Sequence, residues 1–441
     1  MTFEHNRFGD LFSEPQRNGL TRPKKVRGQG FPMVNMGELF AHSRIKDLEM
    51  DLVPVNEEKE QQFFLKDGDL LFARQSLVVA GAGQCSIFLG NNTPTVFESH
   101  LIRCRLDLNK FNPNFYFYFF RSPNGRMAME TIVEQGAGAS GIRGSDLVNL
   151  QVPTPSKNYQ DEASSLLVKI DDRIALLRET NATLEAIAQA LFKSWFVDFD
   201  PVRAKAEGLE PEIMDTATAA LFPDSFEESA LGLVPRGWQI GSILDIANLL
   251  SGGTPKTDRA EFWGGAIPWA SAKDVSQSSN SILTGTERTI TTLGVQKSAT
   301  KMIPAFSTVV VARGATTGRM VMFGTSMAMN QTCYALESKA GTPISLYLIL
   351  KKEIDALTQK AHGSVFDTIT TSTFSASKTL LIPDALLACF EHVAEPLFYR
   401  MLAGTQQAQT LTQLRDTLLP RLISGQLRLP EAEAQIEAVC A

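Results

Sequence analysis

Residues 160–195 read QDEASSLLVKIDDRIALLRETNATLEAIAQALFKSW and carry the hydrophobic pattern that decides how this chain is organised. Steps of four and three residues alternate along the stretch, which is typical of the a/d seam of a coiled coil. The seam positions are Ala163, Leu167, Ile170, Ile174, Leu177, Asn181, Leu184, Ala188, Leu191 and Trp195. At about 1.5 Å per residue, such a helix is roughly 50 Å long and needs a helical partner along its length.

A second apolar stripe near the C-terminus offers that partner within the same chain. It follows Pro396, which could start or kink a helix. The stripe comprises Leu397, Met401, Ala408, Leu411, Leu414, Leu418 and Leu422. We expect the two helices to pair antiparallel, as a rigid spacer between two globular regions.

Each of these helices follows a globular segment, and the two segments repeat one another. The matched stretches are GFPMVNMGEL at 30–39 with AIPWASAKDV at 266–275, LLFAR at 70–74 with VVVAR at 309–313, and QGAGASGIRGSDLVNLQVPTP at 135–155 with AHGSVFDTITTSTFSASKTLLIPD at 361–384. Short β-branched runs bounded by Gly, Pro, Asn and Ser alternate with helical segments in both. The sequence therefore predicts an α+β protein with two similar domains and a pseudo-two-fold internal repeat.

Composition limits the class of protein further. The chain has 441 residues, 44% of them hydrophobic, which is enough for two or more cores. No apolar run reaches the length of a membrane span, and the first residues do not resemble a signal peptide, so we expect a cytoplasmic protein without membrane contact. The 5 Cys and 5 His are dispersed, which argues against a disulfide framework and against a metal site.

The net charge of −6 is unevenly distributed along the chain. Residues 156–234 hold 15 acidic and 7 basic side chains, whereas residues 235–384 hold 10 acidic and 14 basic ones. Residues 1–155 are balanced, with 17 of each. A polyanion could thus be bound by the two globular segments, while the acidic middle would repel phosphate and face other proteins.

Four longer motifs resemble the specificity subunits of type I restriction-modification systems. They are ALFKSWFVDFDPVRAKAEG at 190–208, LFPDSFEESALGLVPRGWQI at 221–240, SGGTPKTDRAEFWGGAIPWASAKDV at 251–275 and LLPRLISGQL at 418–427. The resemblance implies a non-catalytic subunit that recognises a bipartite site in double-stranded DNA. It also implies docking of two methyltransferase subunits and of restriction (translocase) subunits. S-adenosylmethionine, ATP and Mg would then belong to those partners, and this chain would hold no cofactor.

The resemblance and the repeat together predict the domain boundaries. We expect target recognition domain 1 at 1–155, a central spacer helix at 156–200, an acidic linker at 201–234, target recognition domain 2 at 235–384, a C-terminal spacer helix at 385–427 and a tail at 428–441. Trp195, Phe196 and Phe199 lie at the end of the central helix. They could bind a partner subunit, or they could pack internally against the end of the helix pair.

Candidate DNA-binding residues are cations and amides beside turns of the two globular segments. They are Arg22, Lys24, Lys25, Arg27, Arg74, Gln75 and Arg143 in the first segment, and Lys256, Lys273, Arg313, Arg319 and Asn330 in the second. Arg and Lys neutralise phosphate or reach guanine edges, and Gln and Asn suit adenine. The sequence alone does not divide these roles among them.

Two alternative functions compete with DNA recognition by a non-catalytic subunit. NPNF at 112–115 is similar to the N-P-P-[FY] loop of DNA adenine methyltransferases, but Asn114 replaces the second proline. No F-x-G-x-G cofactor loop lies nearby, and no Walker phosphate loop is present. A coiled-coil scaffold acting alone would leave the paired globular segments unexplained.

Overall fold

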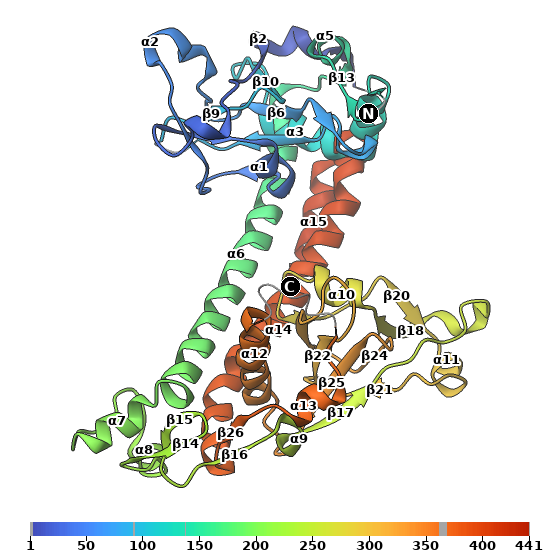
Figure 1. Ribbon diagram of the computed structural model, residues 1–441. Helices are drawn as coiled ribbons and strands as arrows, with labels where there is room; N and C mark the ends of the chain where they lie inside the picture. Colours follow the sequence, from blue (N-terminus) through green and yellow to red (C-terminus); the bar gives the residue numbers. More distant parts are fainter. Residues whose placement is uncertain (1–2, 91–92, 137, 361–367, 441) are drawn as a thin grey trace. The chain divides into compact units, whose positions relative to one another are not determined.

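The computed structural model describes residues 3–90, 93–136, 138–360 and 368–440, and Figure 1 shows the arrangement of its elements. The chain divides into two compact units. Unit 1 comprises Met1–Arg173 and Thr410–Ala441, and unit 2 comprises Ile174–Gln409. The 40-residue helices α6 (Lys157–Phe196) and α14 (Asp384–Ile423) each cross the boundary, so each unit holds a segment of both.

Unit 1 is built around a five-stranded sheet and a three-stranded sheet. The strand orders are β2 (Phe12–Asn18), β10 (Leu101–Leu106), β6 (Leu70–Ala73), β8 (Cys85–Phe88), β4 (Arg44–Ile45) in the first, and β5 (Leu52–Val53), β3 (Phe31–Val34), β9 (Val96–Phe97) in the second. The smaller pairings are β11 (Glu134–Gln135), β12 (Ser140–Gly141), β7 (Gln75–Ser76), and β1 (His5–Arg7) with β13 (Gln151–Pro153). Its other α-helices are α1 (Met36–Ala41), α2 (Glu57–Glu60), α3 (Pro113–Arg121), α4 (Pro123–Glu130), α5 (Gly144–Asn149) and α15 (Leu429–Cys440).

Unit 2 contains a five-stranded sheet and a four-stranded sheet. The strand orders are β17 (Ala247–Ser251), β25 (Cys333–Ser338), β22 (Thr308–Val311), β23 (Met320–Phe323), β19 (Ile282–Leu283), and β20 (Arg288–Ile290), β18 (Trp263–Ala270), β24 (Met327–Met329), β21 (Met302–Ile303). The two-stranded sheets are β14 (Phe226–Ser229) with β15 (Gly232–Pro235), and β16 (Gln239–Gly241) with β26 (Thr379–Leu381). Its other α-helices are α7 (Asp200–Ala206), α8 (Thr216–Ala220), α9 (Ile243–Ile246), α10 (Ala272–Gln277), α11 (Thr292–Gln296), α12 (Pro343–Lys360) and α13 (Thr371–Ser375).

The two units repeat the same sheet topology. In both five-stranded sheets the last two strands pair parallel, β4 with β8 and β19 with β23, while the other neighbours pair antiparallel. The first matched stretch is a strand followed by a capped helix in both units. Asn35 and Glu38 form the capping box of α1, and Ser271 and Asp274 form that of α10. The predicted α+β repeat is confirmed, although residues 361–367 of the third match lie outside the described residues.

Most seam residues of α6 are buried, with Leu184 and Leu191 half-buried, and neighbouring residues of α6 contact α14 within each unit. In unit 1, Tyr159 Oη donates to the Leu422 carbonyl, and Asp171 pairs with Arg415 at 2.7 Å. In unit 2, Phe192 contacts Phe390, with ring centroids 5.6 Å apart. Partner numbers on α14 fall as those on α6 rise, so the helices pair antiparallel.

Pro396 does not start the C-terminal helix, which was one of the two roles that the sequence left open for it. The helix starts at Asp384, so Pro396 lies inside α14. The extra turns add Leu386, Phe390 and Ala394 to the core of unit 2. Burial of these side chains favours helix on both sides of the proline. Among the described residues, no helix combines the length and apolarity needed to cross a membrane.

Candidate nucleic-acid interface

Three of the predicted DNA-binding residues of unit 1 meet in one surface hollow. β6 ends at Ala73, and Arg74 and Gln75 follow it into β7. β7 pairs with β12, which brings the loop that carries Arg143 to the same place. Arg74, Gln75 and Arg143 thereby line a hollow of about 300 Å³, together with Glu134.

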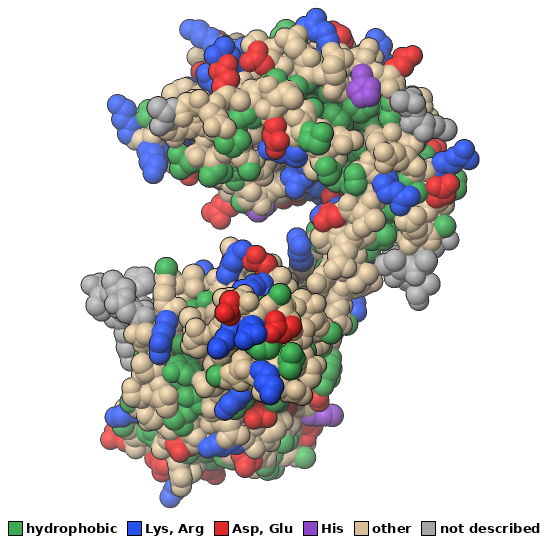
Figure 2. Space-filling view, turned by 90° about the vertical axis from the view of Figure 1, so that its right-hand side faces the viewer, with side chains coloured by type: hydrophobic (Ala, Val, Ile, Leu, Met, Phe, Trp, Pro, Cys, Tyr) green, Lys and Arg blue, Asp and Glu red, His purple; other side chains and the backbone are tan. Residues whose placement is uncertain are grey.

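The cations of this hollow are accessible to a polyanion. Arg143 pairs with Glu134 at 2.7 Å, but both side chains are more than half exposed, so the pair contributes little to stability and can be exchanged for phosphate. The Arg74 side chain is exposed and forms no ion pair with any other described residue. Its backbone is fixed, since its amide donates to His100 and its carbonyl accepts from Ile142. Figure 2 shows Lys and Arg interspersed with acidic side chains on the viewed face.

Unit 2 presents cations at the equivalent turn. β22 ends at Val311, and an isolated antiparallel bridge joins Arg313 to Thr368. This bridge corresponds to the antiparallel pairing of β7 with β12 beside Arg74 in unit 1. The turn is closed by the Gly318 amide, which donates to the Val311 carbonyl. Arg313 and Arg319 are both exposed on this turn. The structure thus places predicted cations at matching positions of the two units.

Arg22 and Arg27 hold the fold of unit 1 together. Arg22 Nη2 donates to both carboxylate oxygens of Glu60 at 2.7 Å. Arg27 donates to Asp51 at 2.6 Å and to the Asn35 side chain at 3.1 Å. These guanidinium groups are engaged in ion pairs, so their role in DNA binding stays a prediction.

Lys24 and Lys25 differ from their neighbours, because they are exposed on a short 3₁₀ turn. Neither forms an ion pair with another described residue, so both remain available to phosphate. In unit 2, Lys256 is also exposed. Lys273 pairs with Glu287 at 2.6 Å, and this hydrogen bond raises the pKa of Lys273.

Asn330 is engaged in a local turn. Its side-chain oxygen accepts hydrogen bonds from the amide and the hydroxyl of Thr332. The Asn330 amide donates to the carbonyl of Ala270 at the end of β18. These bonds hold the segment after β24 in place, and adenine reading by Asn330 stays a prediction.

The aromatic residues at the end of α6 lie in the core of unit 2. Trp195 is 5% exposed and Phe196 is 3% exposed. Trp195 meets Phe390 edge-on, with ring centroids 5.7 Å apart. Phe199 is half-buried and lies in the left-handed region, with φ of 56°. This geometry supports internal packing of Trp195 and Phe196, while partner binding by the three rings stays a prediction.

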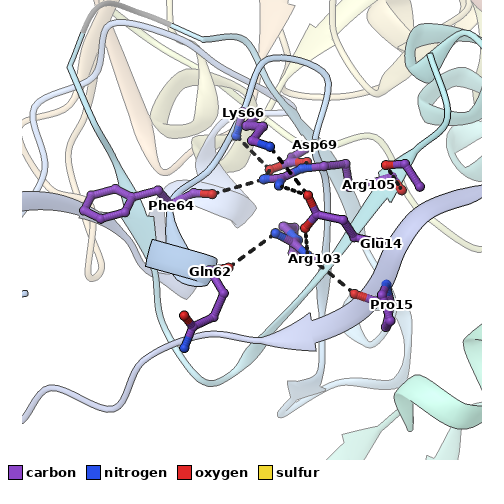
Figure 3. A network of polar contacts seen from close by, with 9 residues as sticks. Glu14, Pro15, Gln62, Phe64, Lys66, Asp69, Arg103 and Arg105 are labelled. Atoms are coloured by element: carbon purple, nitrogen blue, oxygen red, sulfur yellow. Dashed lines mark hydrogen bonds and ion pairs between the residues drawn. The ribbon is translucent and has the colours of Figure 1, made fainter. Parts of the chain in front are cut away.

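A buried ion network in unit 1 was missed by the sequence reasoning (Figure 3). Arg105 donates from Nε and Nη2 to the two oxygens of fully buried Asp69, at 2.7 Å each. Arg103, 1% exposed, reaches Glu14 at 3.2 Å. Burial acts to raise the pKa of Glu14, but the hydrogen bond and charge of Arg105, together with the charges of Arg103 and Lys66, lower it overall. The signal in the sequence was the stretch RCR in β10, because residues two apart in a strand share a face. Arg103 and Arg105 therefore lie on the same face of the sheet.

A second missed feature is an arginine packed against a pair of contacting tryptophans in unit 2. The Arg288 guanidinium carbon lies 3.5 Å from the ring centroid of Trp263 and 5.8 Å from that of Trp269. Trp269 Nε1 donates to the Gly253 carbonyl at 3.0 Å. The contacts join the family-like motif at 251–275 to β20, where cation–π attraction stabilises the sheet edge.

The NPNF stretch has a structural role in this fold. The Asn112 side chain caps α3 by accepting from the Asn114 amide, and its Nδ2 donates to Asp161 at 2.6 Å. The Asn112 amide also donates to Gln160 Oε1 at 2.9 Å. These bonds dock the start of α3 on α6. Within the described residues, no group of three or more His, Cys, Asp or Glu side chains is arranged to hold a metal ion.

The family described as "Type I restriction modification DNA specificity domain" matches residues 2–186 and 235–385. These two segments cover more than half of the chain, and each contains one of the two repeats. The chain belongs to this family. It is therefore a DNA specificity subunit of a type I restriction-modification system.

Curated relatives and a solved structure agree with this membership. The chain is 28% identical to the "Type I restriction enzyme HindI specificity subunit" of Haemophilus influenzae, over 82% of this chain and 87% of that one. It is 22% identical to the "Type I restriction enzyme MjaIX specificity subunit" of Methanocaldococcus jannaschii, over 72% and 69%. The crystal structure of the type I S subunit from M. genitalium shares the fold, with a TM-score of 0.57, 16% identity and 96% coverage of both chains.

Proposed function

We propose that the two units each read one half of a bipartite site in double-stranded DNA. The observation that carries this proposal is that an exposed arginine lies at the turn after β6 and at the equivalent turn after β22. Arg74 and Arg313 begin these turns, and both side chains are exposed. Because the sheet topology is repeated, the same surface is available twice in one chain. A duplicated reading surface suits a site with two specific segments.

The side chains at the two turns have the chemistry for DNA contact. Arginine neutralises phosphate or donates two hydrogen bonds to guanine. The glutamine amide can donate one hydrogen bond to adenine N7 and accept one from adenine N6. The turn of unit 1 offers Arg74, Gln75 and Arg143, while that of unit 2 offers Arg313 and Arg319. Since the two sets differ in composition, the two half-sites are expected to differ in sequence.

The chain itself is proposed to be non-catalytic and to work through partner subunits. Its sequence has neither an F-x-G-x-G cofactor loop beside NPNF nor a Walker phosphate loop. Methylation and cleavage would come from two methyltransferase subunits and from restriction subunits, which would bind S-adenosylmethionine, ATP and Mg. Calorimetry of the purified chain with S-adenosylmethionine tests whether the chain itself binds this cofactor. We expect no binding, and stoichiometric micromolar binding would contradict the proposal.

Mapping of methylated sites tests bipartite reading. The chain is co-expressed with its methyltransferase subunit in a host without endogenous methylation, and modified bases are located by sequencing. We expect two short specific segments separated by a gap of fixed length and free sequence. A single uninterrupted site would overturn the proposal.

Variants connect the mapped site to the two turns. The double variant Arg74→Ala, Arg143→Ala should reduce DNA affinity by at least tenfold, since each lost phosphate or base contact costs about 1–3 kcal/mol. The control is Lys110→Ala, which also removes an exposed cation. Lys110 follows Leu106, whereas Arg74 lies beside Leu101 at the opposite end of β10. Equal loss in both variants would show that charge alone, and not this turn, governs binding.

A further inference from the structure

The turn beside the hollow of unit 1 exposes three consecutive apolar side chains. Leu77 is 89% exposed, Val78 63% and Val79 40%. Scattered apolar residues are common on protein surfaces, but three in a row at one turn form a patch that usually marks a binding surface. We call residues 77–79 the apolar tip.

The apolar tip is held by hydrogen bonds on both sides. The Val78 amide donates to Ser76 Oγ at 3.2 Å, and its carbonyl accepts from the Gly81 amide at 3.0 Å. Arg126 Nη2 donates to the Ala80 carbonyl at 2.9 Å. The tip is therefore preorganised, so contact with a ligand would cost little conformational entropy.

The equivalent turn of unit 2 has no large apolar side chain. It reads RGATTGR at 313–319, and Ala315 and Thr316 occupy its exposed tip. A protein partner present in two identical copies would need similar surfaces on both repeats. A surface that differs between the repeats instead suits two half-sites of different sequence, so the contrast favours DNA as the occupant.

The polar groups beside the tip indicate which part of the DNA the tip contacts. Arg74, Gln75 and Arg143 lie in the adjoining hollow and donate hydrogen bonds. In the major groove, the one apolar group on a base edge is the thymine methyl, and it lies beside acceptor atoms and the phosphate backbone. We propose that Leu77 and Val78 contact a thymine methyl group in the half-site read by unit 1. This proposal rests on the proposed function that each unit reads one half-site.

Replacing thymine by uracil tests the contact, because uracil lacks only the methyl group. Each thymine of the mapped site is replaced in turn in a duplex, and binding to the complex of this chain with its methyltransferase subunit is measured. Burial of one methyl or methylene group is worth about 0.8 kcal/mol, so we expect one uracil position to weaken binding about fourfold. Leu77→Ala should weaken binding to the thymine duplex and lose sensitivity at that position alone. The control Ala315→Gly in unit 2 should keep the sensitivity.

Several results would overturn the proposal. The half-site read by unit 1 could contain no thymine. Leu77→Ala could leave the sensitivity to uracil unchanged. Finally, Leu77→Ala could lose assembly with the methyltransferase subunit on size-exclusion chromatography. The last result would make the tip a protein contact. A site without two halves would defeat the proposed function and this inference together, whereas a two-part site without coupling to Leu77 would defeat the inference alone. Since Leu77 is almost fully exposed, its substitution leaves the core intact.

Discussion

Asn181 and Thr405 hydrogen-bond to each other inside the helix pair of unit 2, with Asn181 Nδ2 donating to Thr405 Oγ1 at 3.0 Å. The same nitrogen donates to the Met401 carbonyl at 3.1 Å. Gly404 makes room for the amide, since a Cβ there would lie 2.6 Å from Asn181 Oδ1. A buried polar residue in an apolar seam fixes which residues face one another, so we infer that Asn181 sets the register of α6 against α14.

Asn181→Ala should lower the free energy of unfolding by about 1–3 kcal/mol, because two buried hydrogen bonds are lost and a small void remains. Urea denaturation followed by circular dichroism measures the change. The control is Asn158→Ala, which removes an exposed hydrogen bond to Glu162 on the same helix. If both variants lost the same stability, the buried amide would have no special role in the pairing.

Asp69→Ala should destabilise unit 1 by about 3–5 kcal/mol, since it leaves the largely buried Arg105 without its bidentate partner. Lys110→Ala breaks the exposed pair with Asp107 at 3.7 Å and should cost less than about 1 kcal/mol. Urea denaturation of both variants provides the comparison. A cost below 1 kcal/mol for Asp69→Ala would mean that water or Glu14 compensates Arg105 fully.

Glu391 introduces a pH dependence into unit 2. Its carboxylate accepts from the amides of Ile344 and Ser345 at the start of α12. Burial raises its pKa above the ordinary value of 4.5, and the hydrogen bonds only partly oppose this. The folded state therefore holds the proton more tightly than the unfolded state, so this group's contribution is present below its ordinary pKa and is lost as pH rises through the folded pKa.

Denaturation of wild type and Glu391→Gln at several pH values isolates this effect, because the variant does not ionise. The unfolding free energy of wild type minus that of Glu391→Gln should be larger at about pH 5 than at about pH 8. A difference that grows with pH would show that the hydrogen bonds to the carboxylate outweigh its desolvation.

The length of the helices should set the gap between the half-sites. Asp171 pairs with Arg415 in unit 1 and Asn181 with Thr405 in unit 2, so seven residues inserted after Leu177 are matched by seven after Ala408. The paired insertions keep the heptad and add about 10 Å, or about three base pairs. Mapped methylation should show unchanged half-sites with a longer gap. An unchanged gap with retained activity would mean that the helices do not determine the spacing.

The sequence predicted features whose signals are periodic or repeated. The α6 seam was readable because heptad spacing is local, and the repeat was readable because element order survives loop insertions. The Arg105–Asp69 pair joins residues far apart in sequence and needs the sheet topology, which no local pattern specifies. Arg22 and Arg27 illustrate the same limit, because a surface cation and an ion-paired one have the same local sequence signature. Pro396 was ambiguous, since the packing of residues on both sides decides whether a helix continues through it.

Exchange of the DNA-reading segment of unit 2 is the decisive test of whether the two units read DNA independently. β16 and β26 lie side by side, with Gln239 opposite Leu381, so residues 239–381 form a module whose two ends are adjacent. This segment is replaced by the matching one of a relative with a different site, and methylated bases are mapped in cells that express the hybrid with its methyltransferase subunit. We expect one half-site to change to that of the donor while the other half-site stays the same. A change in both half-sites, or in neither with methylation retained, would contradict independent reading by the two units.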